Sequence, residues 1–330
     1  MDTEQPNTPK TGQTDSRMES AAALSVPDSG ELYRYLCPVD HKNNFVAMRG
    51  LRSKKGGRHP AILLIHDVGE SSDMYWDCIK FICEQGFSAY SYDQRGHGAD
   101  ADISGHLDRF QDLVADLLQV ASWVRHMHNG MSPIIVGQGY GAIVATEFAA
   151  KYPLLNTGVV LAAPTLELAW MPGPFKRYII KVMSDLAPRI KVPKGLHPRF
   201  SNPLHREMGK TLATRFIQSL IGPRQLRLTF AFARELFEAM DSFSRHFQLL
   251  KKPVLILKPG KDEVARFDSI EKIAATHPNK ALVSTRTVAN VHHNCFTEGS
   301  LPMASILDEV LSWSKGVASK SSIPGAKDPP

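Results

Sequence analysis

Hydrophobic and polar positions follow two different spacings along most of this chain. Short apolar runs with the length of buried strands occur at residues 61–68, 87–92, 133–136, 157–163, 253–258 and 281–288. Longer amphipathic segments with helical spacing occur at residues 73–85, 107–128, 140–152, 268–276 and 303–315. Strands that alternate with helices indicate a parallel sheet that is covered on both faces. The pattern therefore predicts an α/β fold with a mostly parallel central sheet.

The alternation stops between residues 167 and 247. This stretch is helical in its pattern, basic and interrupted by proline. Because it follows a strand of the sheet, we expect it to lie above the carboxyl edge, where open α/β folds bind ligands. We predict a helical, basic cap at 167–247, inserted into a core formed by residues 31–166 and 248–316.

The two ends of the chain, 1–30 and 317–330, are polar and are predicted to be disordered tails. The first of them has no basic patch followed by an apolar segment, and the chain has no run of 18 or more apolar residues. The four cysteines show no CxxC spacing, which is typical of reduced thiols. We expect a cytoplasmic protein that needs no cofactor and no metal.

Positive charge is concentrated in the predicted cap. The chain has a net charge of +6, and residues 170–252 hold 16 Lys or Arg against 5 Asp or Glu. Such a surface can contact phosphate groups or anionic lipid, or it can simply be a solvated basic face. Aromatic residues are not interleaved with the basic ones, so we expect no nucleic-acid partner.

Three glycines at alternate positions join the strand at 133–136 to the next helix. Gly137, Gly139 and Gly141 match the spacing of a nucleophile elbow, G-x-S-x-G, in which a strand turns sharply into a helix. A dinucleotide-binding loop is disfavoured because its third glycine has a different spacing. Glycine adopts the strained elbow conformation easily, so the turn should persist while the nucleophilic hydroxyl is missing at Gly139.

Five segments, in the same order along the chain, resemble motifs of the lysophospholipase and monoacylglycerol lipase group of α/β-hydrolases, which is serine aminopeptidase-like. They are LIHDVGESS at 64–72, YDQRGHG at 92–98, SGHLDRF at 104–110, PVLILKPGKD at 253–262 and VHHNCFTE at 291–298. The likeness spans residues 45–315, and residues 196–201 resemble a segment of the group's lid. It implies the α/β-hydrolase fold with an inserted helical cap.

The resemblance also implies roles for single residues. Asp262 stands at the position of the catalytic acid and His293 at that of the base, with His292 as the alternative base. Backbone N–H groups of Val68 and Tyr140 would form the oxyanion hole. In such a site the histidine takes the proton of the nucleophile, and the acid orients the imidazole.

Asp67 departs from the group's pattern, which has glycine after the histidine of the first motif. A carboxylate at this place would oppose the development of an oxyanion nearby. Its alternative role is to cap the helix that begins near Asp73.

The sequence supports more than one function. Loss of a triad serine costs about 10⁶ in turnover, so the chain is expected to be non-catalytic or strongly impaired. It would then bind a lipid-like or small amphiphilic ligand under its cap. The alternative is an active carboxylic-ester hydrolase of acylglycerols or lysophospholipids that uses an activated water or another nucleophile, such as Cys295 or Ser104. In a third interpretation, Asp262 and His293 perform proton transfer without hydrolysis.

Overall fold

The computed structural model describes residues 33–38, 45–54, 59–98, 101–169, 172–193, 196, 226–297 and 299–321. The predicted tail at 1–30 and residues 197–201 of the predicted lid lie outside these ranges.

In the described ranges, the main sheet has eight strands in the order β1-β2-β4-β3-β5-β6-β8-β10. β2 pairs antiparallel with β1 and β4, and the other neighbours are parallel. The strands are β1 Tyr33–Pro38, β2 Phe45–Leu51, β3 Ile62–Ile65, β4 Ala89–Tyr92, β5 Ile134–Gln138, β6 Gly158–Ala162, β8 Val254–Pro259 and β10 Val283–Val288. The predicted α/β fold with a mostly parallel sheet is confirmed.

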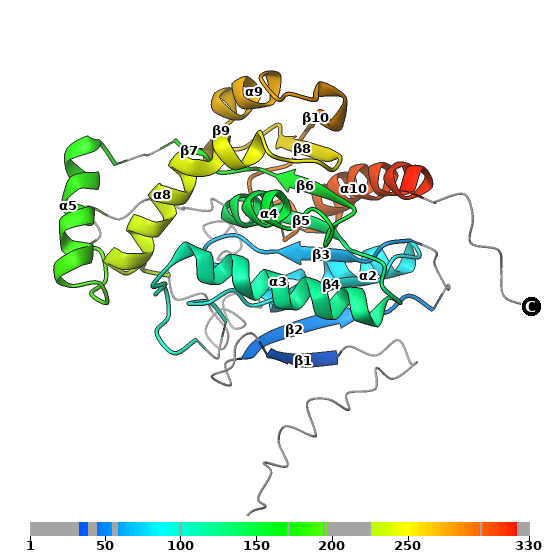
Figure 1. The fold of residues 1–330 in the computed structure, drawn as a ribbon, viewed down its shortest axis with the longest axis horizontal. Coiled ribbons are helices and arrows are strands. Elements are labelled where there is room, and N and C mark those ends of the chain that lie inside the picture. Colours follow the sequence, from blue (N-terminus) through cyan, green and yellow to red (C-terminus); the bar gives the residue numbers. More distant parts are fainter. Residues whose placement is uncertain are drawn as a thin grey trace, which may run out of the picture.

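Helices cover both faces of this sheet (Figure 1). On one face, Leu63 and Ile65 of β3 pack in a core with α3, Phe110–Met127, and α4, Tyr140–Lys151. On the other face, the alternate residues Ile62 and Leu64 pack with α2, Trp76–Glu84, and α10, Ser300–Ser321. β3 is hydrophobic at every position because it is buried on both sides.

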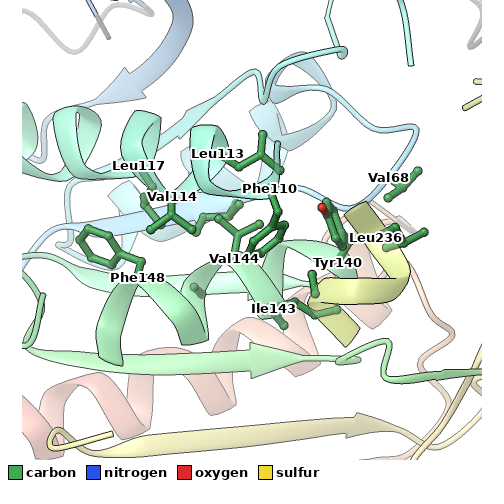
Figure 2. Packing of buried hydrophobic residues seen from close by; sticks show 14 of the residues in the cluster. Val68, Phe110, Leu113, Val114, Leu117, Tyr140, Ile143, Val144, Phe148 and Leu236 are labelled. Atoms are coloured by element: carbon green, nitrogen blue, oxygen red, sulfur yellow. The ribbon is translucent and has the colours of Figure 1, made fainter. Parts of the chain in front are cut away.

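Two helices of the predicted cap lie beyond the carboxyl ends of the strands, at the left of Figure 1. They are α5, Pro174–Leu186, and α8, Phe230–Phe247. The hydroxyl of Thr229 caps α8 by accepting a hydrogen bond from Phe232 N–H. Leu236 of α8 belongs to the core cluster that also holds Tyr140 and Phe110, and Figure 2 shows this packing. The cap is thus joined to the core next to the start of α4.

The cap and the ends of the core differ in part from the predictions. The segment at 167–247 begins with a short strand, β7, Glu167–Leu168, which pairs antiparallel with β9, Ala265–Arg266. The antiparallel strands β1 and β2 were not predicted. α10 continues past residue 316, the predicted end of the core, because Val317 is still buried.

The remaining helical elements are short, and none of the helices in the described part of the chain could span a membrane. The short elements are the 3₁₀ helix η1, Ser72–Tyr75, the helix α9, Asp268–Ala275, and the 3₁₀ helix η2, Lys280–Leu282.

Candidate active site

The glycine-rich turn between β5 and α4 has the geometry of a nucleophile elbow. Gly139 lies at its apex with φ 55° and ψ −116°, a conformation that strains residues with a side chain. A Cβ on Gly137 would lie 2.4 Å from the carbonyl oxygen of Gly141, and a Cβ on Gly141 would lie 2.5 Å from that of Ile65. The flanking glycines are therefore required for the close approach of strand, helix and the neighbouring β3.

The side chain of Asp67 fills the space beside Gly139. A Cβ built on Gly139 would lie 2.1 Å from Asp67 Cγ and 2.2 Å from Asp67 Oδ2. Asp67 comes two residues after the end of β3, so the carboxyl ends of two adjacent strands, β3 and β5, bring Asp67 and Gly139 to the same edge of the sheet. The carboxylate can reach this position because Gly139 has no side chain.

Asp67 also occupies the predicted oxyanion hole. Its Oδ1 accepts hydrogen bonds from the backbone N–H groups of Val68 and Tyr140, each at 2.7 Å. Tyr140 begins α4, so the helix N-terminus adds a favourable partial positive charge. The two predicted N–H donors do converge on one oxygen, and that oxygen belongs to the protein itself.

The other oxygen of Asp67 contacts the predicted base. His293 Nε2 lies 3.0 Å from Asp67 Oδ2, and His293 Nδ1 lies 2.8 Å from Asp262 Oδ2. Asp262 is held in turn by the N–H groups of Val264 and Ala265, which both donate to its Oδ1 at 2.8 Å. Of the two adjacent histidines, it is His293 whose ring contacts Asp262.

These contacts set the charge of the histidine. Burial by itself lowers the pKa of His293, but the hydrogen bonds to Asp262 and Asp67, together with their negative charges, raise it to about 10. The ring is therefore an imidazolium at neutral pH, clamped between two carboxylates. In this state it has no lone pair with which to accept a proton from water.

A second buried carboxylate, Glu70, ties the loops of the site together. It accepts hydrogen bonds from the backbone N–H of Asp67 and from the Tyr75 hydroxyl. Its oxygens also accept from the side-chain amides of Gln138 and Asn294, at the end of β5 and next to His293. Glu70 thus fixes the positions of the three segments that carry Asp67, Gly139 and His293.

The other candidate nucleophiles make contacts that involve the backbone. Cys295 is fully buried, and its thiol donates to the backbone carbonyls of His293 at 3.3 Å and His292 at 3.8 Å. Ser104 is an exposed residue whose carbonyl oxygen accepts a hydrogen bond from Lys191. These contacts of both residues involve backbone carbonyls, and the site described above is formed without either side chain.

The alternative role proposed for Asp67 is not found. The residue at the N-cap position of η1 is Ser71, and the Asp67 carboxylate faces the elbow instead of capping this helix. The expectation that Asp67 would oppose an oxyanion assumed a hole that is open to a substrate, whereas Asp67 Oδ1 itself takes both donors of the hole.

A family model described as serine aminopeptidase, S33, matches residues 57–300, which include the elbow, Asp67, Asp262 and His293. The chain belongs to this family. The match covers most of the sheet and the whole site, so the resemblance found in the five sequence motifs is confirmed.

Two relatives of this chain are named as a monoacylglycerol lipase and a probable lysophospholipase. The chain is 22% identical over 256 residues to the monoacylglycerol lipase of Mycolicibacterium smegmatis, covering 76% of this chain and 86% of that protein. It is 21% identical over 283 residues to a probable lysophospholipase L2 of Haemophilus influenzae, covering 82% of this chain and 88% of that protein.

Solved structures of the same fold confirm the architecture. The monoacylglycerol lipase of Paleococcus ferrophilus has a TM-score of 0.64 at 20% identity and covers 88% of this chain and 100% of its own. A soluble variant of the Saccharomyces cerevisiae monoglyceride lipase, in complex with a substrate analog, has a TM-score of 0.65 at 16% identity, with 89% and 97% covered. At these identities the likeness establishes the α/β-hydrolase fold alone.

Sequence reasoning missed the position of Asp67 and the linking role of Glu70. A signal for the first was present in the two departures from the S33-type motifs. A side chain is gained at residue 67, where glycine is usual, and one is lost at Gly139, where serine is usual. Two changes of opposite volume can compensate when the two positions touch, as they do here.

Proposed function

We propose that this S33-family chain is strongly impaired in ester hydrolysis and that it acts by binding a lipid-like or small amphiphilic ligand under its cap. The observation that carries this proposal is the position of the Asp67 carboxylate. It fills the space of a nucleophilic side chain at Gly139, and its Oδ1 takes both N–H donors of the oxyanion hole. An ester carbonyl would find neither a serine hydroxyl nor vacant donors at this site.

The alternative, hydrolysis by a water molecule that His293 activates, is less well supported. A general base must be unprotonated at the working pH. The pKa of His293 is raised to about 10, and its Nε2 is already engaged with Asp67. Acylglycerols and lysophospholipids remain the ligand classes to examine, because the relatives at 21–22% identity are named for hydrolysing them.

Ligand binding is tested by titrating the purified full chain with 1-oleoylglycerol and with lysophosphatidylcholine, followed by product analysis. We expect saturable, equimolar binding of at least one of them, without release of fatty acid. Leu226→Arg should weaken binding at least about 10-fold, because this half-buried residue lies at the junction of the cap and the loop of Gly69, where a charge would oppose an apolar ligand. The control is Leu154→Arg, at an exposed position after α4. Absence of saturable binding contradicts the proposal.

We further propose that α5 brings the cap into contact with anionic membranes. Phe175, Tyr178 and Leu186 on this helix are 65–75% exposed, which is unusual for large apolar side chains. Exposed cations accompany them at Lys181 and Arg189. An amphipathic helix with apolar side chains beside Lys and Arg has the chemistry of an interfacial helix on acidic lipid.

Vesicle sedimentation tests this contact. We expect the protein to bind vesicles of phosphatidylcholine with phosphatidylserine, to bind pure phosphatidylcholine much less, and to dissociate as salt is raised. Phe175→Ala with Tyr178→Ala should reduce partitioning at least about 10-fold, because each ring contributes about 1.5–3 kcal/mol when buried. Leu301→Ala, 80% exposed on α10, is the matched control and should bind like the unmodified chain. Equal binding of all three proteins would disprove a role for α5.

A further inference from the structure

A cavity of about 270 Å³ lies at the carboxyl end of β4. Its wall is formed by the start of β2, the loop at 93–97 and residues of the segment 101–112. Asp67, Gly139 and His293 are not among the lining residues, so the cavity is separate from the elbow. It is much larger than a cavity that holds a single water molecule and close in size to the smaller sites that bind organic molecules.

The wall of this cavity is acidic. It contains four aspartates and one arginine, namely Asp93, Asp102, Asp108, Asp112 and Arg95. The arginine donates to the carboxylate of Asp116 at 2.6 and 2.8 Å, so its charge is balanced by a residue outside the wall. Arg49 and Arg109 pair with two of the aspartates. The other two, Asp102 and Asp108, are exposed. The cavity therefore favours a cation over an anion.

Two side chains of the wall, Gln94 and His97, are 1% and 6% exposed, and each has an atom without a hydrogen-bond partner among the described residues. These atoms are Gln94 Oε1 and His97 Nε2. Gln94 Nε2 donates to the carbonyl of His66 at 2.6 Å, and His97 Nδ1 lies 3.1 Å from the carbonyl of Arg95. A carbonyl only accepts, and burial lowers the pKa of His97 to about 3, so the neutral ring carries its hydrogen on Nδ1 and a lone pair on Nε2. Because a buried acceptor without a partner is costly, both atoms call for a donor.

Apolar side chains complete the wall. Phe45, the first residue of β2, is 45% exposed, and Val46, Ile103 and Leu107 also belong to the wall. The face of an aromatic ring attracts organic cations, as carboxylates do. Within the described ranges, no group of three or more His, Cys, Asp or Glu side chains could hold a metal ion. The wall thus suits an organic cation that has N–H donors and an apolar part.

We propose that this cavity binds a primary alkylammonium ion. The N–H groups of the ion donate to Gln94 Oε1 and His97 Nε2, its charge is attracted by Asp102 and Asp108, and its alkyl chain packs on Phe45. A primary ammonium has three N–H donors, whereas a quaternary ammonium has none and an anion would be repelled. The site is distinct from the place of an amphiphile under the cap and does not rest on the binding proposed there.

Calorimetric titration of the full chain with a series of hexyl compounds tests the proposal, because the members differ only in the head group. We expect saturable, equimolar binding of hexylammonium that weakens as salt is raised. Hexyltrimethylammonium, hexanol and hexanoate should bind at least about 10-fold more weakly, since they lack N–H donors, positive charge or both. In ¹⁵N NMR spectra, hexylammonium should shift the signal of His97 Nε2 and hexyltrimethylammonium should not. Absence of saturable hexylammonium binding by the folded chain, or equally tight binding of hexanoate, would overturn the proposal.

Variants of the wall locate the binding site. Asp102→Asn with Asp108→Asn should weaken hexylammonium binding at least about 5-fold, because two carboxylates are lost. Phe45→Ala should weaken it about 2- to 5-fold through loss of the aromatic face. The matched controls are Asp308→Asn on α10 and Phe175→Ala on α5, both at exposed positions, and they should bind like the unmodified chain. Unchanged affinity in the double variant, or an equal loss in either control, would place the amine elsewhere and contradict the proposal.

Discussion

The double variant Asp67→Gly with Gly139→Ser is expected to hydrolyse nitrophenyl esters and monoacylglycerols at least about 10³-fold faster than the unmodified chain. The first substitution empties the oxyanion hole and the space at the elbow, and the second supplies the missing hydroxyl. Asp262 and His293 already stand 2.8 Å apart, so the acid and the base need no rearrangement. The measurement is initial rate with each ester.

Gly139→Ser alone is expected to remain inactive. A serine Cβ would lie 2.1 Å from Asp67 Cγ, so the carboxylate would have to leave the site. Its departure would break its hydrogen bonds to Val68, Tyr140 and His293 and leave a buried charge without those partners. We therefore expect this single variant to be less stable and to show no gain in ester hydrolysis.

The control for the double variant is Asp67→Gly with Gly139→Ala, which has the same backbone and nearly the same volume but no hydroxyl. It should be silent. If Gly139→Ser alone gained activity, Asp67 would not be the group that blocks the site. If the folded double variant were silent, the site would differ from an esterase by more than these two residues.

The sequence was sufficient for the core of the fold because burial leaves a periodic pattern. β3 and β5 are apolar at nearly every position, and parallel strands buried on both faces show such runs. β1, at the edge of the sheet, and its antiparallel neighbour β2 were missed because they carry mixed residues, such as Arg34 and Arg49, among the apolar ones. In a single sequence, such segments cannot be distinguished from a polar tail.

The residues of the candidate site could be predicted from the sequence, but the presence of the Asp67 side chain in the oxyanion hole could not. The order of motifs along the chain placed Asp262 and His293 on neighbouring loops, and the structure brings them together. Motif order says nothing of which way a side chain points. The sequence therefore predicts only that the charge of Asp67 opposes an oxyanion of the substrate. In the structure the Asp67 carboxylate packs beside Gly139 and itself occupies the oxyanion hole. The direction of the Asp67 side chain depends on its contact with Gly139, which is distant in the sequence, and this contact is seen only in the three-dimensional structure.

Raising the pH through the alkaline range is expected to destabilise the protein by on the order of 5 kcal/mol through His293 alone. The pKa of this histidine is raised from 6.5 to about 10, so the folded state binds its proton more tightly than the unfolded state. The stabilisation is complete below pH 6.5 and declines as the pH rises towards 10. The measurement is the free energy of unfolding from urea titrations at several pH values.

Other groups act in the upper part of this range. Burial raises the pKa of the Cys37 and Cys83 thiols to about 12, so they ionise more readily in the unfolded chain and also favour unfolding at high pH. The informative window is therefore pH 6.5–8.5, where about 2 kcal/mol of the loss should be due to His293. Asp67→Asn removes one of its two neighbouring carboxylates, lowers its pKa and should give a shallower slope in this window.

The same measurement decides which chemistry the resting site can perform. A steep decline, together with an imidazole NMR signal that titrates far above pH 7, would show that His293 is an imidazolium held by Asp67 and Asp262. Hydrolysis through a water activated in the resting state would then require loss of a tightly held proton. A flat profile with a neutral His293 at pH 7 would contradict the charge pairing and would favour the water-activated ester hydrolase instead. The protonation state of the base thus depends on Asp262 together with the Asp67 carboxylate that fills the elbow.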